Sequence, residues 1–258
     1  MGEAIMSEAV TTNAENGVLT ITINRPEAKN AVNREVAEGI AAAIETLESD
    51  DSLIIGIITG AGGTFCSGMD LKAFLQGELP VVAGKGFAGF VEDPPAKPLI
   101  AAVDGYALAG GMELAIACDL VVANKDAQFG IPEAKRGLAA GAGALLRLPR
   151  LMPQRYAMEL ALTGDFISAQ RAAEMGLVNR VVDGPALDGA KELAATIAEN
   201  GPLAVKASKE VIVKTEDWSH DEMWAKQQEI IGGIFQSEDA REGAMAFAQK
   251  RKPEWKGR

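Results

Sequence analysis

The stretch Pro98-Leu-Ile-Ala-Ala-Val-Asp-Gly-Tyr-Ala-Leu-Ala-Gly-Gly-Met-Glu-Leu-Ala115 predicts a buried strand, a tight turn and a short apolar helix in succession. Residues 98–103 are a continuous apolar run of strand length, which is typical of a strand covered on both faces. Asp104-Gly105 marks a turn, and residues 111–118 are apolar enough for a buried helix. Such alternation of strands and helices favours an α/β fold with a parallel sheet and crossover helices.

The alternation continues on both sides of this stretch. Residues 18–24 alternate as a half-buried strand does, residues 33–49 carry an apolar stripe at helical spacing, and residues 53–59 predict a second buried strand. Residues 1–15 are polar and without period, so we expect a loose tail there. Residues 76–97 hold Gly and Pro but few periodic signals. We expect a mobile lid in this region, with four candidate pocket walls: Phe74, Leu75, Phe87 and Phe90.

After about residue 140 the sequence predicts a series of helices, with one strand at residues 178–182. Ser168 and Ser237 stand where helix N-caps are expected. We place a spiral core at residues 1–188 and a helical oligomerisation region at residues 189–258. The helical region is rich in apolar side chains, including Trp218, Trp224 and Phe235, which favours packing between subunits.

Composition and charge narrow the class of protein. The chain has 258 residues, 48% of them hydrophobic, and a formal net charge of −11. The negative charge argues against nucleic-acid binding and against anionic membranes. Cys66 and Cys118 match no metal-site or disulfide spacing, and residues 1–15 do not resemble a signal peptide. We therefore expect a cytoplasmic protein with buried thiols and no metal.

Two glutamates stand out as candidate catalytic groups. Glu113 and Glu133 each lie in an apolar, Gly-containing stretch. Desolvation raises the pKa of a carboxyl group, so that it can act as an acid or a base near neutral pH. The alternative is that both are partly exposed residues at helix starts.

Two Gly-rich turns predict an oxyanion hole. Met69 follows Gly68, and Gly110 precedes the short helix that carries Glu113. Backbone N–H groups from a turn and from a helix start can converge on one oxygen atom, and the helix dipole adds partial positive charge there. Most Gly-rich turns have no catalytic role, so this pattern alone is weak evidence for an oxyanion hole.

Several motifs together give the chain a strong resemblance to the crotonase superfamily, specifically its enoyl-CoA hydratase branch. They run in family order over almost the whole sequence: residues 24–31, 59–72, 98–115, 127–133, 237–243 and 247–253. The resemblance implies a crotonase-like spiral of ββα units, followed by C-terminal helices that build a homotrimer or a hexamer of two trimers. It also implies a coenzyme A thioester as substrate and no separate cofactor.

The resemblance assigns roles to individual residues. The N–H groups of Met69 and Gly110 hold the thioester oxygen, and Glu113 and Glu133 hold a water, with the N–H of Gly141 as a further contact. Water then adds to one face of a 2-enoyl-CoA and gives a 3-hydroxyacyl-CoA, as in fatty-acid β-oxidation. The implied CoA contacts are Ala28, Lys29, Ala31, Ser67, Asp70, Leu71 and Lys72, with Phe247 and Lys250 reaching the CoA of a neighbouring subunit.

The sequence leaves other functions open. Lys135-Arg136, shortly after Glu133, is more cationic than the mitochondrial-type pattern. This cationic pair also fits an enzyme that acts on a polar acyl group, as the carnitinyl-CoA dehydratase relatives do. A Δ3,Δ2-enoyl-CoA isomerase and a non-catalytic acyl-CoA-binding protein are further alternatives. A serine hydrolase would need Ser67 to meet His220, the only histidine in the chain.

Overall fold

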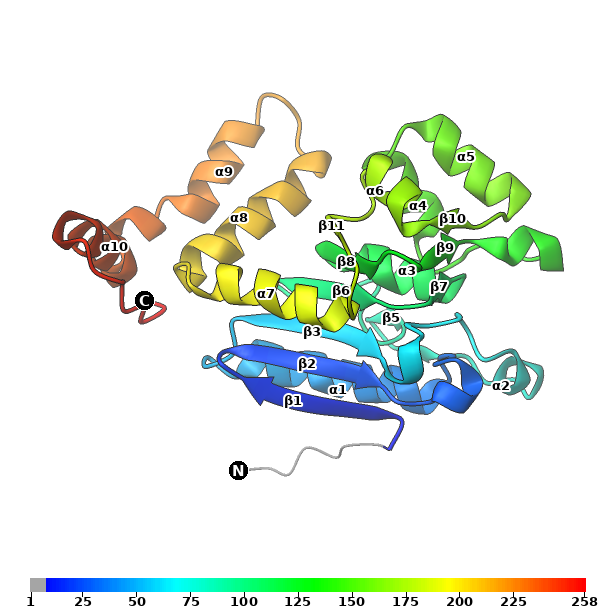
Figure 1. Cartoon of the computed structure of the whole chain (residues 1–258). Coiled ribbons are helices and arrows are strands. Elements are labelled where there is room, and N and C mark those ends of the chain that lie inside the picture. The colour runs from blue at the N-terminus through cyan, green and yellow to red at the C-terminus, as the bar shows by residue number, and fades with distance from the viewer. Residues whose placement is uncertain (1–7) are drawn as a thin grey trace.

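The apolar runs of the sequence form the large sheet of the computed structural model, which describes residues 8–258 (Figure 1). Its strand order is β1-β2-β3-β6-β8-β11, and every neighbouring pair from β2 to β11 is parallel. β1 pairs antiparallel with β2 at one edge. The bounds are β1 Val10–Glu15, β2 Val18–Ile23, β3 Ile55–Gly60, β6 Leu99–Val103, β8 Leu120–Asn124 and β11 Arg180–Val182.

Alternate side chains of the central strands enter two separate cores. Ile57 and Ile100 pack with Ala190 of α7 (Ala186–Ala198) on one face. Ile58 and its neighbours on the other face pack with α1 (Arg34–Ser49). Burial on both faces explains why these strands are continuous apolar runs rather than alternating ones.

A second, smaller sheet receives the chain after β6 and again after β8. Its order is β10-β9-β7, with bounds β7 Tyr106–Leu108, β9 Gln128–Gly130 and β10 Ile167–Ser168. Cys66 extends it by bridging to Ala107. The chain thus runs from β6 through β7 into α3 (Gly110–Ala117), and from β8 through β9 into the 3-10 turn η3 (Pro132–Arg136). This repetition is the ββα spiral that the sequence predicted.

Two expectations for irregular segments were wrong. Val10–Glu15 is not part of a loose tail, because it pairs with β2 along its full length; residues 1–7 lie outside the described part. The segment expected to be a lid contains the short hairpin β4 (Val81–Val82) and β5 (Gly86–Phe87), followed by fully buried Phe90 and Val91. Residues 86–91 belong to the core, because Gly89 lets the backbone lie directly on Ala37 of α1, whereas most of residues 76–85 are exposed.

The remaining helices fall into two groups (Figure 1). α4 (Ala144–Leu151), α5 (Gln154–Thr163) and α6 (Ala169–Glu174) lie near the small sheet, whereas α8 (Pro202–Lys214), α9 (Met223–Ile231) and α10 (Glu238–Gln249) extend away from both sheets. Ser168 and Ser237 are N-caps as predicted, since each hydroxyl accepts an N–H bond from the following turn. The predicted domain boundary at residues 188/189 falls within α7 and stays a prediction.

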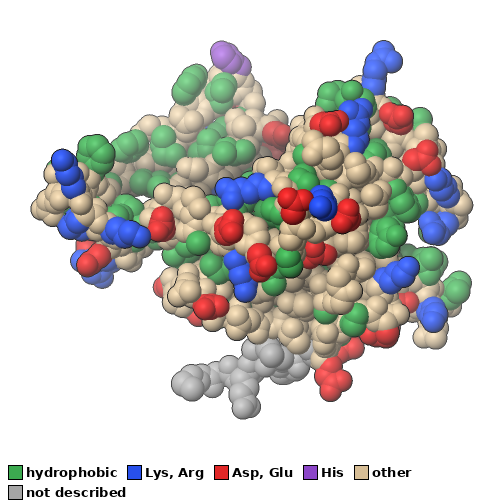
Figure 2. Space-filling view, viewed as in Figure 1, with side chains coloured by type: hydrophobic (Ala, Val, Ile, Leu, Met, Phe, Trp, Pro, Cys, Tyr) green, Lys and Arg blue, Asp and Glu red, His purple; other side chains and the backbone are tan. Residues whose placement is uncertain are grey.

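The extended arm α8–α10 carries apolar side chains on its surface, visible at the upper left of Figure 2. Four of them are more than two-thirds exposed: Ile212, Trp224, Phe235 and Phe247. An exposed apolar area of this kind marks a contact surface. None of the helices among residues 8–258 is long and apolar enough to cross a bilayer.

Substitution of Gly111 tests how closely α3 packs against the segment at Cys66, which extends the small sheet. A Cβ atom at this position would lie 2.1 Å from the backbone oxygen of Cys66. We expect Gly111→Ala to lower the free energy of unfolding by about 2 kcal/mol or more, because two backbone segments would have to separate. Denaturant unfolding measures the change. Gly184→Ala is the control, since no atom lies within 4 Å of its Cβ position; equal loss in both variants would contradict the close contact.

Candidate active site

Glu113 is the one charged residue of α3, and it is buried with an exposed fraction of 3%. Its Oε1 accepts hydrogen bonds from the N–H groups of Ala142 (2.8 Å) and Ala144 (3.0 Å). The turn that leads into α4 therefore fixes one oxygen of the carboxylate. Two backbone donors on a carboxylate orient it and offset part of the cost of burial.

Glu133 lies on η3, directly after Pro132, and is half-buried. Its Oε2 is buried and has no hydrogen-bond partner among residues 8–258. An unpaired buried carboxylate oxygen costs stability, and natural structures tolerate one where function needs it. Glu133 therefore has the features of a group that a bound molecule completes.

Burial raises the pKa of both carboxyl groups above their ordinary value. For Glu113, the N–H groups of Ala144 and Ala142 and the charge of Arg147 oppose this rise. For Glu133, the negative charge of Glu113 adds to the effect of burial, while its own backbone N–H and Arg136 oppose it. Because each charge disfavours the other, the pair favours a state in which one carboxyl keeps its proton.

The two predicted oxyanion donors belong to turns that touch. A Cβ atom on Gly68 would lie 3.1 Å from the nitrogen of Gly110 and 3.0 Å from the oxygen of Leu108. Gly68 has φ +102°, and Ala109 has φ 52° and ψ −129°, which is a strained conformation for a residue with a side chain. The N–H groups of Met69 and Gly110 donate to no acceptor within the described part of the chain.

One cavity of about 620 Å³, here called the large cavity, joins these groups. Glu113, Glu133, Met69, Gly110 and Gly141 all line it, so the sequence prediction for the central groups of the site agrees with their placement. Phe87 closes the wall behind Gly110, since a Cβ atom there would lie 2.6 Å from its ring. The assigned roles are not tested by this placement.

The predicted CoA-contact residues divide into two sets. Lys29, Ser67 and Leu71 line the large cavity, and the ammonium of Lys29 lies 5.7 Å from the ring centroid of Tyr106. The other four, Ala28, Ala31, Asp70 and Lys72, do not line the cavity.

Asp70 and Ala31 have structural contacts instead. The Asp70 carboxylate caps α2 (Leu71–Leu75) and pairs with Arg25 at 3.0 Å, and the same guanidinium donates to the oxygen of Ala31. Arg25 thus joins the two loops that carry Lys29 and Ser67. Lys72 is exposed.

Phe247 lies on α10 and Lys250 is its C-cap; in Figure 1, α10 and the cavity-lining helix α2 lie at opposite sides of the molecule. Both are exposed, and neither lines the cavity. Their contact with the CoA of a neighbouring subunit stays a prediction.

The wall candidates Phe74 and Phe87 line the large cavity, whereas two others do not. Leu75 is 84% exposed and Phe90 is fully buried in the core. Sequence reasoning also missed three residues that surround Glu113. Ala142 and Ala144 act through backbone N–H groups, which no side-chain motif reveals. Arg147 places a half-buried guanidinium near the carboxylate while donating to the oxygen of Val91.

The residues considered for a serine hydrolase do not lie together. Ser67 lines the large cavity, but His220 is exposed in the segment between α8 and α9, away from it. Cys66 and Cys118 are free and buried as predicted, and burial raises the pKa of the Cys66 thiol to about 12. Within residues 8–258, no three His, Cys, Asp or Glu side chains are arranged to hold a metal ion.

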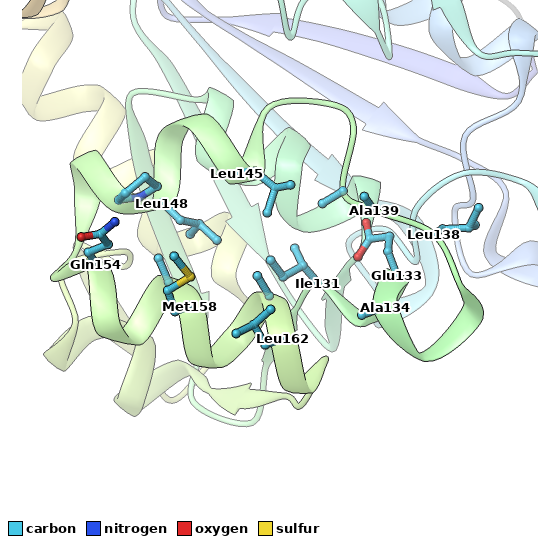
Figure 3. Close-up of a pocket in the computed structure, with 14 residues that line it drawn as sticks. Ile131, Glu133, Ala134, Leu138, Ala139, Leu145, Leu148, Gln154, Met158 and Leu162 are labelled. Carbon is cyan, nitrogen blue, oxygen red and sulfur yellow. The ribbon is translucent and has the colours of Figure 1, made fainter.

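A second cavity of about 450 Å³, here called the apolar cavity, lies behind Glu133 (Figure 3). It lies between η3, α4 and α5, and its lining residues Leu145, Met158 and Leu162 are exposed. Glu133, Leu138 and Ala139 line both cavities, so these residues stand at the junction between them.

Comparison with known proteins agrees with the fold. The sequence model of the enoyl-CoA hydratase/isomerase family matches residues 13–258. The crystal structure of enoyl-CoA hydratase from Mycobacterium tuberculosis H37Rv has a TM-score of 0.96 at 56% identity, covering 98% of this chain and 100% of that one. Carnitinyl-CoA hydratase from Mycobacterium avium has a TM-score of 0.78 at 43% identity, with the same coverage.

Among curated sequences, carnitinyl-CoA dehydratase of Proteus mirabilis (strain HI4320) is 41% identical over 262 residues, covering 98% of this chain and 100% of the relative. The chain belongs to the enoyl-CoA hydratase/isomerase family and thus to the crotonase superfamily. Its similar proteins carry both hydratase and dehydratase names, so membership leaves the particular acyl substrate open.

The raised pKa of Glu133 predicts a pH-dependent effect on stability. Its carboxyl binds a proton more tightly in the folded protein than the ordinary pKa of 4.5 implies, so the resulting stabilisation is complete below about pH 4.5 and is lost as pH rises through the folded-state pKa. We expect Glu133→Gln to raise the Tm by about 2 °C at neutral pH and to change it little in acid. Thermal unfolding across this range measures the difference.

Glu159→Gln is the control for this measurement, because Glu159 is an exposed carboxylate on α5. A difference between Glu133→Gln and the wild type that stays constant from acid to neutral pH would contradict the assigned desolvation.

Proposed function

We propose that this protein is an enoyl-CoA hydratase, which adds water to the double bond of a 2-enoyl-CoA thioester and gives a 3-hydroxyacyl-CoA. The observation that carries the proposal is the pair of buried carboxyl groups in the large cavity, one held by two N–H groups and the other with an unpaired oxygen. Both face a cavity that also contains two unused backbone donors.

The N–H groups of Met69 and Gly110 polarise the thioester carbonyl. As oxygen adds to C3, negative charge moves through C2 onto the thioester oxygen, where these donors stabilise it. Gly110 opens α3, so the helix N-terminus adds its partial positive charge at the same point. The thioester is itself the electron sink, and the reaction as proposed uses no redox cofactor.

The two carboxyl groups have opposite protonation states in this mechanism. Ionised Glu113 accepts a proton from water as the new C3–O bond forms, and its two N–H bonds stabilise the ionised form. Protonated Glu133 delivers a proton to C2, and its raised pKa keeps it protonated at higher pH than an ordinary glutamate. Both groups act from one wall, so hydrogen and hydroxyl add to the same face.

The CoA portion and the assembly follow from the same proposal. Lys29 and Ser67 line the large cavity and are suited to the polar CoA chain, which carries phosphates to a protein of net charge −11. We further propose a homotrimer or a hexamer of two trimers, because the exposed apolar side chains of α8–α10 need a partner and α10 then brings Phe247 and Lys250 to a neighbouring site.

The second candidate is a carnitinyl-CoA dehydratase, which the 41% identity to such enzymes favours. Dehydration is the same reaction in reverse, so one set of carboxyl groups and backbone donors serves both. The two candidates differ in the acyl group. Loss of absorbance by crotonoyl-CoA compared with crotonobetainyl-CoA tests them directly: turnover of the second compound alone would replace the hydratase proposal.

We expect Glu113→Gln and Glu133→Gln each to lower kcat for crotonoyl-CoA by about 10³-fold, because general acid–base groups contribute effects of this order. Ligand affinity should change by no more than a few-fold, since neither change removes volume. Glu159→Gln is the matched control, because it makes the same substitution on an exposed surface. Either variant retaining activity near that of the wild type would refute the role assigned to its residue.

Gly68→Ala tests the oxyanion donors. The new methyl group would lie 2.9 Å from the Cβ of Ala109 and crowd the nitrogen of Gly110, so we expect kcat to fall about 10²-fold. Gly63→Ala is the matched control, because Gly63 also has a positive φ but no atom within 4 Å of its Cβ position. Steady-state kinetics measure kcat for both variants. A similar loss of kcat in both would assign the effect to backbone strain alone.

A further inference from the structure

Arg147 is a half-buried arginine of α4 whose charge has no bonded counter-ion. Its guanidinium donates a hydrogen bond to the backbone oxygen of Val91, which is fully buried. Within residues 8–258, no carboxylate accepts a hydrogen bond from Arg147. A partly desolvated charge without an ion pair costs stability, so a role is needed that offsets this cost.

The guanidinium of Arg147 occupies space that only a glycine at position 143 leaves open. A Cβ atom on Gly143 would lie 2.1 Å from Nη1 of Arg147 and 3.4 Å from its Cζ. Gly143 has φ +106°, which favours glycine as well. Its two neighbours, Ala142 and Ala144, are the residues whose N–H groups bond to the carboxylate of Glu113. The guanidinium therefore packs on the middle of the turn that holds Glu113.

The hydrogen bond of Arg147 to Val91 reaches a second segment of the site. The N–H of Val91 bonds to the oxygen of Phe87, and the Phe87 ring lies directly behind Gly110. Arg147 thus connects the turn that holds Glu113 with the segment that packs against one of the two proposed oxyanion donors. A planar guanidinium has several donors in a fixed fork, so it can contact two backbone segments at once, whereas a lysine ammonium cannot.

The charges around this pair favour an ionised Glu113. Burial raises the pKa of Glu113, and its two backbone N–H bonds and the positive charge of Arg147 oppose that rise. Burial lowers the pKa of Arg147, and the charge of Glu113 raises it; Arg150 adds to the lowering and Cys118 to the raising.

The second carboxyl group of the site has a different neighbouring cation. The negative charge of Glu113 raises the pKa of Glu133, and Arg136, not Arg147, is the arginine that opposes this rise. A change at Arg147 should therefore affect one carboxyl group of the pair more than the other.

We propose that Arg147 is a positioning residue of the active site, which holds the turn at Gly143 in place so that the two N–H groups of this turn stay directed at Glu113. Its positive charge also favours the carboxylate form, which accepts a proton from water. The inference rests on the proposed function, because it takes Glu113 to be the base. It goes further by giving a part in the reaction to a side chain that does not line the large cavity.

The first experiment compares kcat and KM for crotonoyl-CoA across pH in the wild type and in Arg147→Met, which removes the charge and the donors. We expect kcat to fall about 10-fold while KM stays within about three-fold, because the base is displaced and the cavity is not. Without the positive charge, Glu113 ionises at higher pH. We therefore expect the ratio of kcat/KM at about pH 5.5 to that at about pH 8 to fall at least about three-fold. The alkaline limb, assigned to Glu133, should move less.

Two further variants test the two contributions of the side chain. Arg155→Met is the matched control, because Arg155 is exposed on α5. Arg147→Lys keeps the charge but not the fork, so we expect its acid limb to match that of the wild type while kcat falls about three-fold or more. If Arg147→Met does not fold, Arg147→Lys carries the test, and wild-type kcat in this variant would overturn the inference. A lower kcat in Arg147→Met with an unchanged pH profile would also overturn it, because a purely structural contact gives that result.

A titration that needs no turnover separates this inference from the proposed function. Infrared spectroscopy follows the carboxyl band of Glu113, identified as the band that is absent from Glu113→Gln. We expect this carboxyl group to lose its proton at higher pH in Arg147→Met than in the wild type or in Arg155→Met. An identical titration in all three proteins would overturn the inference. If the titration shifts as expected but no enoyl-CoA is hydrated, Arg147 remains the positioning residue of Glu113 and the hydratase proposal fails.

Discussion

The burial of one carboxylate within an apolar helix is the constraint around which this site is arranged. The carboxylate of Glu113, on α3, accepts hydrogen bonds from the N–H groups of the turn at Ala142 and Ala144. Without these bonds its charge would face an apolar core. Because the turn opens α4, the hydrogen bonds tie α3 to α4 and so to the wall of the apolar cavity. Arg147 adds a third support from the first part of α4.

The position of α3 depends in turn on close backbone contacts. Gly111 lies against the oxygen of Cys66, and Gly68 lies against Ala109 and the nitrogen of Gly110. Each contact is available only to glycine, and together they bring the turns of two successive ββα units into register. The pair of backbone donors therefore arises from the way the units stack rather than from any single motif.

Much of this arrangement was predictable from the sequence. The buried strands followed from apolar runs, and the resemblance to a known family named Glu113, Glu133, Met69 and Gly110, which share one cavity in the structure. The single-sequence signals failed where local composition conflicts with tertiary contacts. Val10–Glu15 is polar because it forms an edge strand. Phe87 to Val91 follow Gly86 and include Gly89, yet they are buried in the core.

The backbone groups that hold Glu113 were harder to foresee than the predicted oxyanion donors. Ala142 and Ala144 carry no functional side chain, and only the folded turn brings their N–H groups to Glu113. Phe247 and Lys250 illustrate a different difficulty. Their predicted role depends on a neighbouring subunit, so the fold of a single chain cannot bring them to the site in which they would act.

The groups proposed to carry out the reaction are different from those that would select the acyl group. The carboxyl groups and backbone donors act on atoms that every 2-enoyl thioester shares, so they do not distinguish a hydratase from a dehydratase of the same superfamily. Discrimination between acyl groups must come from side chains that lie beyond C3. Side chains that line the large cavity beside the two carboxyl groups, among them Phe87 and Leu138, take no part in the hydrogen bonds to Glu113. A family with one reaction centre can thus acquire different substrates by changing the lining of one cavity.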